Sequence, residues 1–334
     1  MAKEIDILAI GDVTADAFIR LKQADVHCDL HENKKCELCV RFGDKVPYEF
    51  TKIISATGNS ANAAVCASRL GLSSAVLAYV GDDENGKNII TGLEKENVDT
   101  SYIGVQKDAE TNFNYILWYK EERTIFIKHF PFEYSLPEIK TKPKWIYFSS
   151  LPEGATSFHG ELADFLEKNK DVKLCFQPGT MQIKLGHKKL KKIYQCSDVF
   201  ICNKAEAQKI LSSDEQEIPK LLKAIHELGP KIVVITAGPD GSYTYDTTKD
   251  EMYFMPMYPD PKPPYERTGA GDAFSSTFVS ALALGKDIKE ALLWAPVNSM
   301  SVVQYVGAQE GLLSREKLEN YIKKAPKDYS AKCV

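Results

Sequence analysis

A regular alternation of short apolar strands with helical patterns, in the second half of the chain, constrains the fold most strongly. The strands are expected at 145–148, 174–176, 199–202 and 232–236, and the helices that follow them at 157–169, 185–194, 204–211 and 215–228. Strands that alternate with helices form a parallel sheet that is covered by helices on both faces. We therefore predict an α/β protein, with a three-layer α/β/α domain around a mostly parallel central sheet.

Two extended segments in the first half, 17–54 and 101–130, do not fit this alternation. We predict that they form a small β-sheet that projects from the main domain. In open α/β sheets, ligands bind at the carboxyl ends of the strands, so a projecting sheet can serve as a lid that excludes water. The chain 1–334 is therefore interpreted as one domain with a β-sheet lid.

The composition narrows the class of protein. With 44% hydrophobic and 26% charged residues among 334, the chain has the balance of a soluble globular protein. Its net charge of −4 gives no electrostatic basis for binding nucleic acid or an anionic membrane. No apolar run approaches the ~20 residues of a membrane-spanning helix, and the first residues lack the apolar core of a signal peptide. We expect a cytoplasmic protein, whose eight cysteines serve mainly as thiols or metal ligands.

One glycine-rich stretch precedes a helical pattern and carries a carboxylate. Its sequence is Thr268-Gly269-Ala270-Gly271-Asp272. Glycines leave backbone N–H groups uncovered, and a helix N-terminus adds further free N–H groups and a partial positive charge. An anion-binding loop beside a carboxylate meets the needs of phosphoryl transfer to a hydroxyl. The alternative is a glycine turn with an aspartate that caps the helix.

A second group of residues with metal-ligand chemistry lies in the polar segment 22–46. Its members are Cys28, His31, Cys36 and Cys39. Three thiols and one imidazole can form a closed tetrahedral zinc site, with His27 as a competing ligand. Such a site would fix a segment that lacks an apolar core of its own. The alternatives are a redox pair at Cys36 and Cys39, or scattered thiols without a common role.

Five separate stretches together resemble the signatures of the ribokinase-like carbohydrate kinase family, often named PfkB. They are Gly11-Asp12-Val13-Thr14-Ala15-Asp16, Thr57-Gly58-Asn59-Ser60-Ala61-Asn62, Asn203-Lys204-Ala205-Glu206, Thr236-Ala237-Gly238-Pro239-Asp240-Gly241 and the stretch that ends at Asp272. They follow the family's order from about residue 5 to 324. The resemblance implies a ribokinase-like fold and a kinase that uses ATP and Mg²⁺.

The resemblance also implies roles for individual residues. Asp272 would take the proton from the acceptor hydroxyl, while the amides of Gly269, Ala270 and Gly271 would stabilise the transferring phosphoryl group. Asn203 and Glu206 would lie near the triphosphate and Mg²⁺ and act through water, although their spacing also suits a plain helix cap. The nucleotide side would consist of Thr236, Gly238, Gly241, Thr268 and Asn298. The acceptor side would consist of Asp16, Gly58, Asn59 and Asn62, with Arg123 at the tip of the lid hairpin either reaching the substrate or lying in solvent.

Three departures from the family pattern leave the substrate open. Glu266-Arg267 replaces the usual Asp-Thr, which affects the phosphate region and a monovalent-cation site that some relatives have. Thr57 replaces the first glycine of its signature. Gln177 lies in a stretch where many relatives have Asp-Pro-Asn.

We expect an ATP-dependent kinase of a hydroxymethyl group on a sugar or sugar derivative. A nucleoside kinase of the same family is the main alternative, because aromatic residues of the lid could stack on a base. They are Phe113, Tyr115, Trp118, Tyr119 and Phe126. A non-catalytic ligand sensor, or a partner-docking role for the Cys/His segment, is less favoured. An exposed lid resembles the dimer clasp of several relatives and implies a homodimer.

Overall fold

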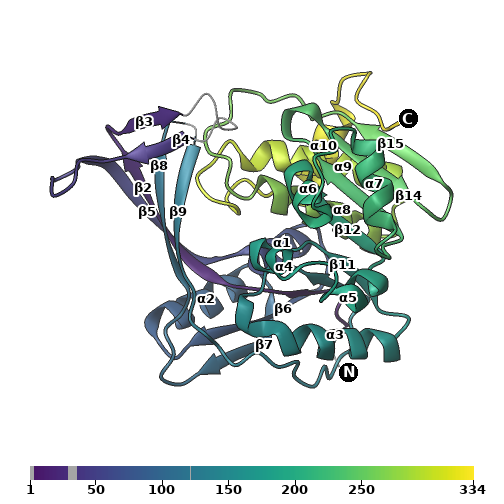
Figure 1. Ribbon diagram of the computed structural model, residues 1–334, viewed down its shortest axis with the longest axis horizontal. Helices are drawn as coiled ribbons and strands as arrows, with labels where there is room; N and C mark the ends of the chain where they lie inside the picture. Colours follow the sequence, from purple (N-terminus) through teal and green to yellow (C-terminus); the bar gives the residue numbers. More distant parts are fainter. Residues whose placement is uncertain (1–3, 29–35, 121) are drawn as a thin grey trace.

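The computed structural model describes residues 4–28, 36–120 and 122–334. Within these residues a ten-stranded sheet forms the centre of the molecule, in the order β16-β15-β14-β13-β12-β11-β10-β1-β6-β7 (Figure 1). Its strands are β1 (Ile7–Ile10), β6 (Ser74–Gly81), β7 (Asp99–Gln106), β10 (Trp145–Phe148), β11 (Lys173–Phe176), β12 (Val199–Asn203), β13 (Ile232–Thr236), β14 (Ser242–Asp246), β15 (Glu251–Met255) and β16 (Lys332–Cys333). The neighbouring strands β7, β6, β1, β10, β11, β12 and β13 are parallel to one another. The strands β14, β15 and β16 continue the sheet in antiparallel pairs. The predicted, mostly parallel sheet is confirmed.

Helices cover both faces of this sheet and bury a separate apolar core on each. One core is formed with α1 (Asn59–Arg69), α2 (Glu84–Lys95), α8 (Ala270–Ala283), α9 (Ile288–Val302) and α10 (Arg315–Lys323). The other is formed with α3 (Thr156–Lys168), α4 (Thr180–Leu185), α5 (Lys191–Cys196), α6 (Lys204–Leu211) and α7 (Ile218–His226). Residues of the parallel strands alternate between the two cores, as the period of two along a strand requires. The three-layer α/β/α architecture follows.

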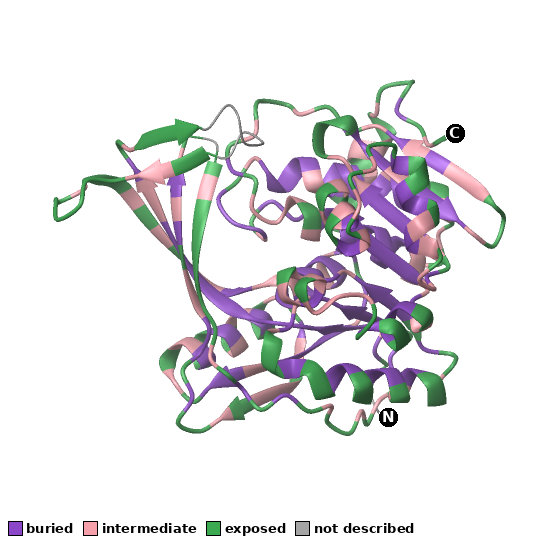
Figure 2. Cartoon of the chain, viewed as in Figure 1, coloured by how far each residue is buried: buried purple, intermediate pink, exposed green. Residues whose placement is uncertain are grey.

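The lid is a separate four-stranded sheet in the order β5-β2-β8-β9. Its strands are β2 (Thr14–Leu21), β5 (Tyr48–Thr57), β8 (Phe113–Tyr119) and β9 (Glu122–Lys128). It projects to the left of the main body in Figure 1, and Figure 2 shows that its far part is largely exposed while its root is buried. A two-stranded sheet, β3 (Asp25–Cys28) with β4 (Cys36–Cys39), extends from it.

Two features differ from the sequence-based expectations. Residues 101–106 belong to β7, which pairs with β6 at the edge of the central sheet, so this part of the segment 101–130 is not lid. The helix expected at 185–194 begins only at Lys191, as α5, because α4 ends at Leu185 and Gly186 follows it with a φ of 86°. A positive φ is unfavourable for other residues and interrupts a helix.

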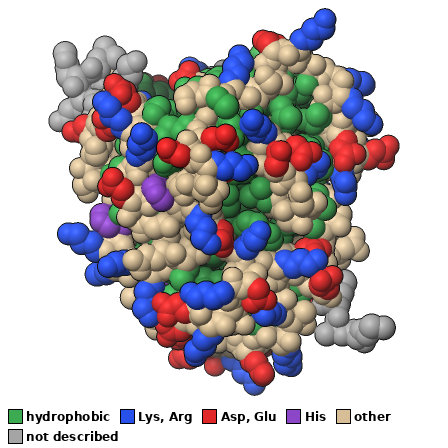
Figure 3. All heavy atoms as spheres, turned by 90° about the vertical axis from the view of Figure 1, so that its right-hand side faces the viewer, with side chains coloured by type: hydrophobic (Ala, Val, Ile, Leu, Met, Phe, Trp, Pro, Cys, Tyr) green, Lys and Arg blue, Asp and Glu red, His purple; other side chains and the backbone are tan. Residues whose placement is uncertain are grey.

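The distribution of charged side chains on the surface and the character of the helices are those of a globular protein. Acidic and basic side chains are interspersed over the face shown in Figure 3, with apolar side chains between them. Among the described residues, no helix combines the length and apolar character needed to cross a membrane.

Candidate active site

Asp272 lies in the first turn of α8 and accepts hydrogen bonds on both carboxylate oxygens. Asn59 Nδ2 donates to Oδ1 at 2.8 Å, and Asn62 Nδ2 donates to Oδ2 at 2.8 Å. Gln177 Nε2 approaches the same carboxylate, at 3.4 Å from Oδ1. Burial raises the pKa of Asp272, while the three amides and the charge of Arg123 counteract that rise. Three regions of the chain, α8, α1 and the end of β11, therefore converge on one carboxylate.

The loop before α8 presents an open helix N-terminus. Gly269 precedes the helix with a φ of 82°, and no side chain caps the first turn. A Cβ on Gly269 would lie 2.3 Å from the Cβ of Ala308, so this position has room for glycine alone. Ala270 and Gly271 line the neighbouring cavity, and Ser299 Oγ donates to the carbonyl of Ala270 at 3.0 Å. Uncapped amides at a helix N-terminus bind anions.

Glu266 is a buried carboxylate that holds this loop in place. Its Oε1 accepts from the amide of Thr268 at 2.8 Å and from the Thr268 hydroxyl at 2.6 Å, and its Oε2 accepts from the amide of Gly307 at 3.3 Å. The lid supplies Arg123, whose Nε lies 3.7 Å from Oε1. Arg267 instead lies 3.7 Å from the lid residue Glu122. The unusual Glu-Arg pair thus connects the anion loop to the lid.

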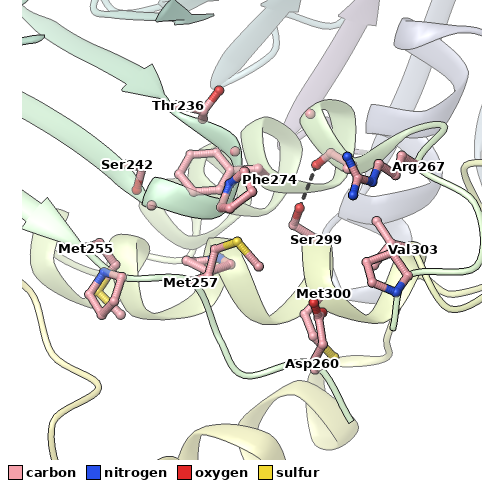
Figure 4. A pocket seen from close by; sticks show the side chains of 18 residues that line it. Thr236, Ser242, Met255, Met257, Asp260, Arg267, Phe274, Ser299, Met300 and Val303 are labelled. Carbon is pink, nitrogen blue, oxygen red and sulfur yellow. Dashed lines mark hydrogen bonds between the residues drawn. The ribbon is translucent and has the colours of Figure 1, made fainter. Parts of the chain in front are cut away.

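A cavity of about 340 Å³ opens beside the anion loop (Figure 4). Three predicted nucleotide residues that follow or end β13, Thr236, Gly238 and Gly241, line it. The apolar part of its wall includes Met255, Met257, Phe274, Met300 and Val303. An apolar slot that ends at uncapped helix amides has the chemistry to hold a purine nucleotide by its base and its phosphates.

Asn298 does not line this cavity, contrary to the expectation. It is fully buried, where its Nδ2 donates to Thr277 Oγ1 at 2.9 Å and its Oδ1 accepts from the amide of Leu313 at 2.9 Å. Its neighbour Ser299, one residue further along α9, does line the cavity. Successive helix residues point about 100° apart, so the cavity receives one and the core receives the other.

Asn203 and Glu206 form a reciprocal cap at the start of α6. Glu206 Oε2 accepts from the amide of Asn203 at 2.9 Å, and Asn203 Oδ1 accepts from the amide of Glu206 at 2.9 Å. Burial, with a contribution from the charge of Asp272, raises the pKa of Glu206. A carboxylate whose proton affinity is raised by a second carboxylate is a suitable partner for a divalent cation. The capping alternative is therefore realised in this structure, and the Mg²⁺ role stays a prediction.

The acceptor side contains a second buried carboxylate at the root of the lid. Asp16 on β2 is 8% exposed, and its Oδ1 accepts from Thr14 Oγ1 at 3.0 Å and from Asn114 Nδ2 at 3.0 Å. Burial raises the pKa of Asp16, and hydrogen bonds from Thr57, Thr14 and Asn114 oppose that rise. The lid strands therefore place the polar pair Asp16 and Asn114 beside the buried apolar cluster of Phe18, Ile116 and Trp118, on the same side of the sheet.

A tight backbone approach sets the position of the two asparagines that hold Asp272. Gly58 links β5 to α1 with a φ of 101°, and a Cβ there would lie 2.5 Å from the carbonyl of Asp12. This turn starts α1 so that Asn59 and Asn62 reach the carboxylate. Of the predicted acceptor residues, Gly58, Asn59 and Asn62 are thus brought together.

Two polar residues near these carboxylates were not predicted as site residues. Gln177 directly follows the carboxyl end of β11, a position where ligands gather in α/β sheets. Asn114 lies on β8 opposite Asp16, between two aromatic residues. Its signal in the sequence is a polar residue within an aromatic strand, which points to the opposite face from its neighbours.

The Cys/His segment differs from the predicted zinc site. Cys28 and Cys36 face each other across β3 and β4 and form a disulfide, while Cys39 is a free thiol. His31 lies outside the described residues. A cysteine binds zinc as a thiolate, so in this state Cys28 and Cys36 do not provide two of the four expected ligands. Among the residues described, no group of three or more His, Cys, Asp or Glu is arranged to hold a metal ion.

The carboxylate beside an anion loop and a nucleotide-sized cavity, on an α/β/α body with a β-sheet lid, defines a phosphotransferase with an alcohol as acceptor. The sequence profile of pfkB family carbohydrate kinases matches residues 32–315, and the chain belongs to this family. Its members, which include sugar and nucleoside kinases, are ATP-dependent.

Individual relatives agree with this assignment. The chain is 26% identical over 326 residues to an ATP-dependent 6-phosphofructokinase of Thermoanaerobacterium thermosaccharolyticum, covering 92% of this chain and 90% of the relative. It is 27% identical over 278 residues to a ribokinase of Haemophilus influenzae, covering 80% and 87%. The crystal structure of a Methanocaldococcus jannaschii nucleoside kinase superposes with a TM-score of 0.77 at 19% identity, covering 97% of this chain and 100% of the other. The ribokinase-like fold is thereby confirmed.

Proposed function

We propose that this protein transfers the γ-phosphoryl group of ATP to a hydroxyl of a sugar or sugar derivative, and that this hydroxyl belongs to a primary hydroxymethyl group. One observation carries the proposal: Asp272 lies at the junction of the anion loop and the amides of Asn59 and Asn62. A carboxylate in that place reaches both an acceptor hydroxyl and the end of a triphosphate. Membership of a family of ATP-dependent kinases supports the same reaction.

In the proposed mechanism, Asp272 accepts the proton of the acceptor hydroxyl while the oxygen of that hydroxyl bonds to the γ-phosphorus. The bond from that phosphorus to the bridging oxygen breaks, and its electron pair leaves with ADP. The amides of Gly269, Ala270 and Gly271 donate to the charged oxygens of the transferring group. The raised pKa of Asp272 suits a general base that works near neutral pH.

Cations have a defined place in this proposal. Glu206, with Asn203, would hold Mg²⁺ through water, and the ion would neutralise phosphate charge. The influence of Asp272 on the pKa of Glu206 supports this placement, because the two carboxylates lie close enough to interact. A monovalent cation near Glu266 stays a prediction. An assay in which K⁺ is replaced by a bulky organic cation tests it.

The orientation of the lid side chains favours a sugar over a nucleoside. Asn114 faces Asp16, so Phe113 and Tyr115 on the same strand point to the other face. Phe126 pairs with Tyr115 and lies on that outer face too, where both are more than half exposed. Phe113, Tyr115 and Phe126 therefore point away from the acceptor side. Trp118 lies on the same face as Asn114, but its ring is fully buried and is not free to stack on a base.

The outer face of the lid also supports a homodimer. Ile53, Tyr115 and Phe126 form one cross-strand row, with Ala17 between Ile53 and Tyr115, and their exposures are 67%, 52% and 55%. Three exposed apolar side chains in one row of a lid sheet mark an interaction surface. We assign it to a second copy of this chain.

The test is a panel of acceptors assayed with ATP and Mg²⁺ by ADP release. The panel should contain free sugars, sugar phosphates, sugar acids and nucleosides, and ³¹P NMR of the product should identify the phosphorylated carbon. We expect one sugar class to react at its hydroxymethyl group. Asp272→Asn should lower kcat by about 10²- to 10⁴-fold with little change in ADP affinity.

Other outcomes would redirect the proposal. Turnover of nucleosides without any sugar would establish the nucleoside kinase alternative. No phosphoryl transfer to any acceptor, together with equal ligand affinities of the wild type and Asp272→Asn, would support the non-catalytic sensor.

A further inference from the structure

The lid hairpin β8–β9 brings one cation, Arg123, against the loop that precedes α8. This holds for the ion pairs among the described residues. Arg123 lies near the start of β9, opposite Trp118. Its side chain is 26% exposed, whereas the following residues of β9 are all exposed. Trp118 is fully buried and packs edge-on against Tyr265, with ring centres 4.9 Å apart. This packing fixes the end of the hairpin over the loop that begins at Glu266.

The guanidinium of Arg123 lies near Glu266 and within electrostatic range of Asp272. Its Nε is 3.7 Å from Glu266 Oε1, and its charge is close enough to Asp272 to oppose the rise that burial causes in the pKa of that carboxyl. Glu266 in turn fixes Thr268, at the start of the anion loop. Arg123 therefore faces the region between the general base and the loop, where the γ-phosphoryl group would travel.

One donor of Arg123 is unused. Its Nε–H is buried and has no hydrogen-bond partner among the described residues, and the 3.7 Å separation from Glu266 is too long for a hydrogen bond. Glu266 already accepts from Thr268 and Gly307, so it does not depend on Arg123 for its hydrogen bonds. A buried, unpaired donor on a guanidinium is costly unless an anionic ligand completes it.

We propose that Arg123 is a catalytic residue that the lid contributes: it donates to an equatorial oxygen of the transferring γ-phosphoryl group, and Glu266 holds the guanidinium in position. The inference rests on the proposed kinase function. Charge on the three equatorial oxygens is shared between the amides of the anion loop on one side and Arg123 on the other. The bonds that form and break are the same as in the mechanism above. Arg123 supplies charge and a hydrogen bond, and it neither gains nor loses a proton.

The test compares Arg123→Ala, Arg123→Lys and a matched control, Arg20→Ala. Arg20 is also a lid arginine beside Trp118, where its guanidinium stacks at 4.0 Å and donates to Lys120, so its removal causes the same charge change. We expect Arg123→Ala to lower kcat by about 10²- to 10³-fold with KM for ATP changed less than about fivefold. Arg20→Ala should keep kcat within about threefold, and added guanidinium should partly restore Arg123→Ala.

Binding separates a catalytic role from a structural one. Affinities for ADP alone, and for ADP with aluminium fluoride and the acceptor as a mimic of the transition state, should be measured by calorimetry. Arg123→Ala should lose affinity for the transition-state mimic and keep its affinity for ADP. Equal losses for both ligands, or a drop in thermal stability that Arg123→Lys fully repairs together with kcat, would assign Arg123 to a structural contact and overturn the inference.

The two proposals fail in different ways. Wild-type protein without kinase activity on any acceptor would remove the proposed function. Loss of activity in Asp272→Asn with an undiminished kcat in Arg123→Ala would leave that function intact and refute the role of Arg123.

Discussion

Two glycines of the anion loop, the stretch 268–271 before and at the start of α8, differ in the space available for a side chain. Gly269 has a φ of 82° and no space for a Cβ, while a Cβ on Gly271 would meet nothing within 4 Å. Gly269→Ala should therefore destabilise the protein by about 1–3 kcal/mol, because it combines backbone strain with a clash. Gly271→Ala should change stability by less than about 0.5 kcal/mol.

The same pair separates folding from nucleotide binding. Since Gly271 lines the cavity, a methyl group there would occupy space beside the phosphates, and KM for ATP should rise about tenfold or more, while the fold is kept. Thermal denaturation and steady-state kinetics on both variants check this. A Gly271→Ala protein with unchanged KM for ATP would mean that the phosphates do not approach this residue.

At the residue scale, the sequence was informative wherever a residue follows a strand end or a helix start. Asp272, Gly58, Asn59 and Asn62 could be assigned to one site because the stretches that carry them resemble the signatures of the carbohydrate kinase family. Asn298 could not be placed, because a position in the sequence does not show which side of a helix faces a cavity. The partner of Arg123 was likewise beyond prediction, since it depends on where the lid lies over the loop.

At the scale of elements, an ion pair joins the lid's last strand to the sheet. His129 follows β9, and its Nδ1 lies 3.3 Å from Asp12 Oδ2 at the end of β1. Tyr134 donates to the other oxygen of Asp12 at 3.3 Å. Hydrogen bonding to Asp12 raises the pKa of His129 above its ordinary value near 6.5, although burial opposes the rise.

This pair should make stability depend on pH. A raised histidine pKa means that the folded state binds the proton more tightly, so the stabilisation is complete below about pH 6.5 and is lost as the pH rises through the folded pKa. Partial exposure limits the effect to less than about 1 kcal/mol. Urea denaturation of wild type and His129→Gln should show a difference at pH 5.5 that shrinks by pH 8.5. A constant difference would contradict the assignment.

Elements also show where periodicity misleads. The sequence predicts a helix over 185–194, yet α4 ends at Leu185, Gly186 has a positive φ and α5 begins at Lys191. The segment 101–130 is predicted as lid because it does not fit the alternation of strands and helices, whereas residues 101–106 pair with β6, which is a long-range contact. Local patterns give the type of an element, but its partner is set by tertiary packing.

At the scale of the whole molecule, the row formed by Ile53, Tyr115 and Phe126 predicts the oligomeric state. Light scattering at micromolar concentration should give the mass of a dimer, and Phe126→Glu should give a monomer, since a charge would be desolvated in the interface. Phe42→Glu is the matched control, because Phe42 is fully exposed but lies outside the lid sheet. A wild-type protein that is monomeric at these concentrations would contradict the prediction.

The packing of Trp118 makes the position of the lid measurable by tryptophan fluorescence. Of the three tryptophans in the chain, Trp145 lies in the central sheet and Trp294 lies in α9, both inside the main body. Trp118 alone sits on the lid, with its indole held against Tyr265 of the loop that precedes α8. Opening of the lid would transfer this indole from an apolar environment to water and shift its emission to longer wavelength. The protein thus carries an intrinsic fluorophore whose colour reports whether its active site is covered, without any added label.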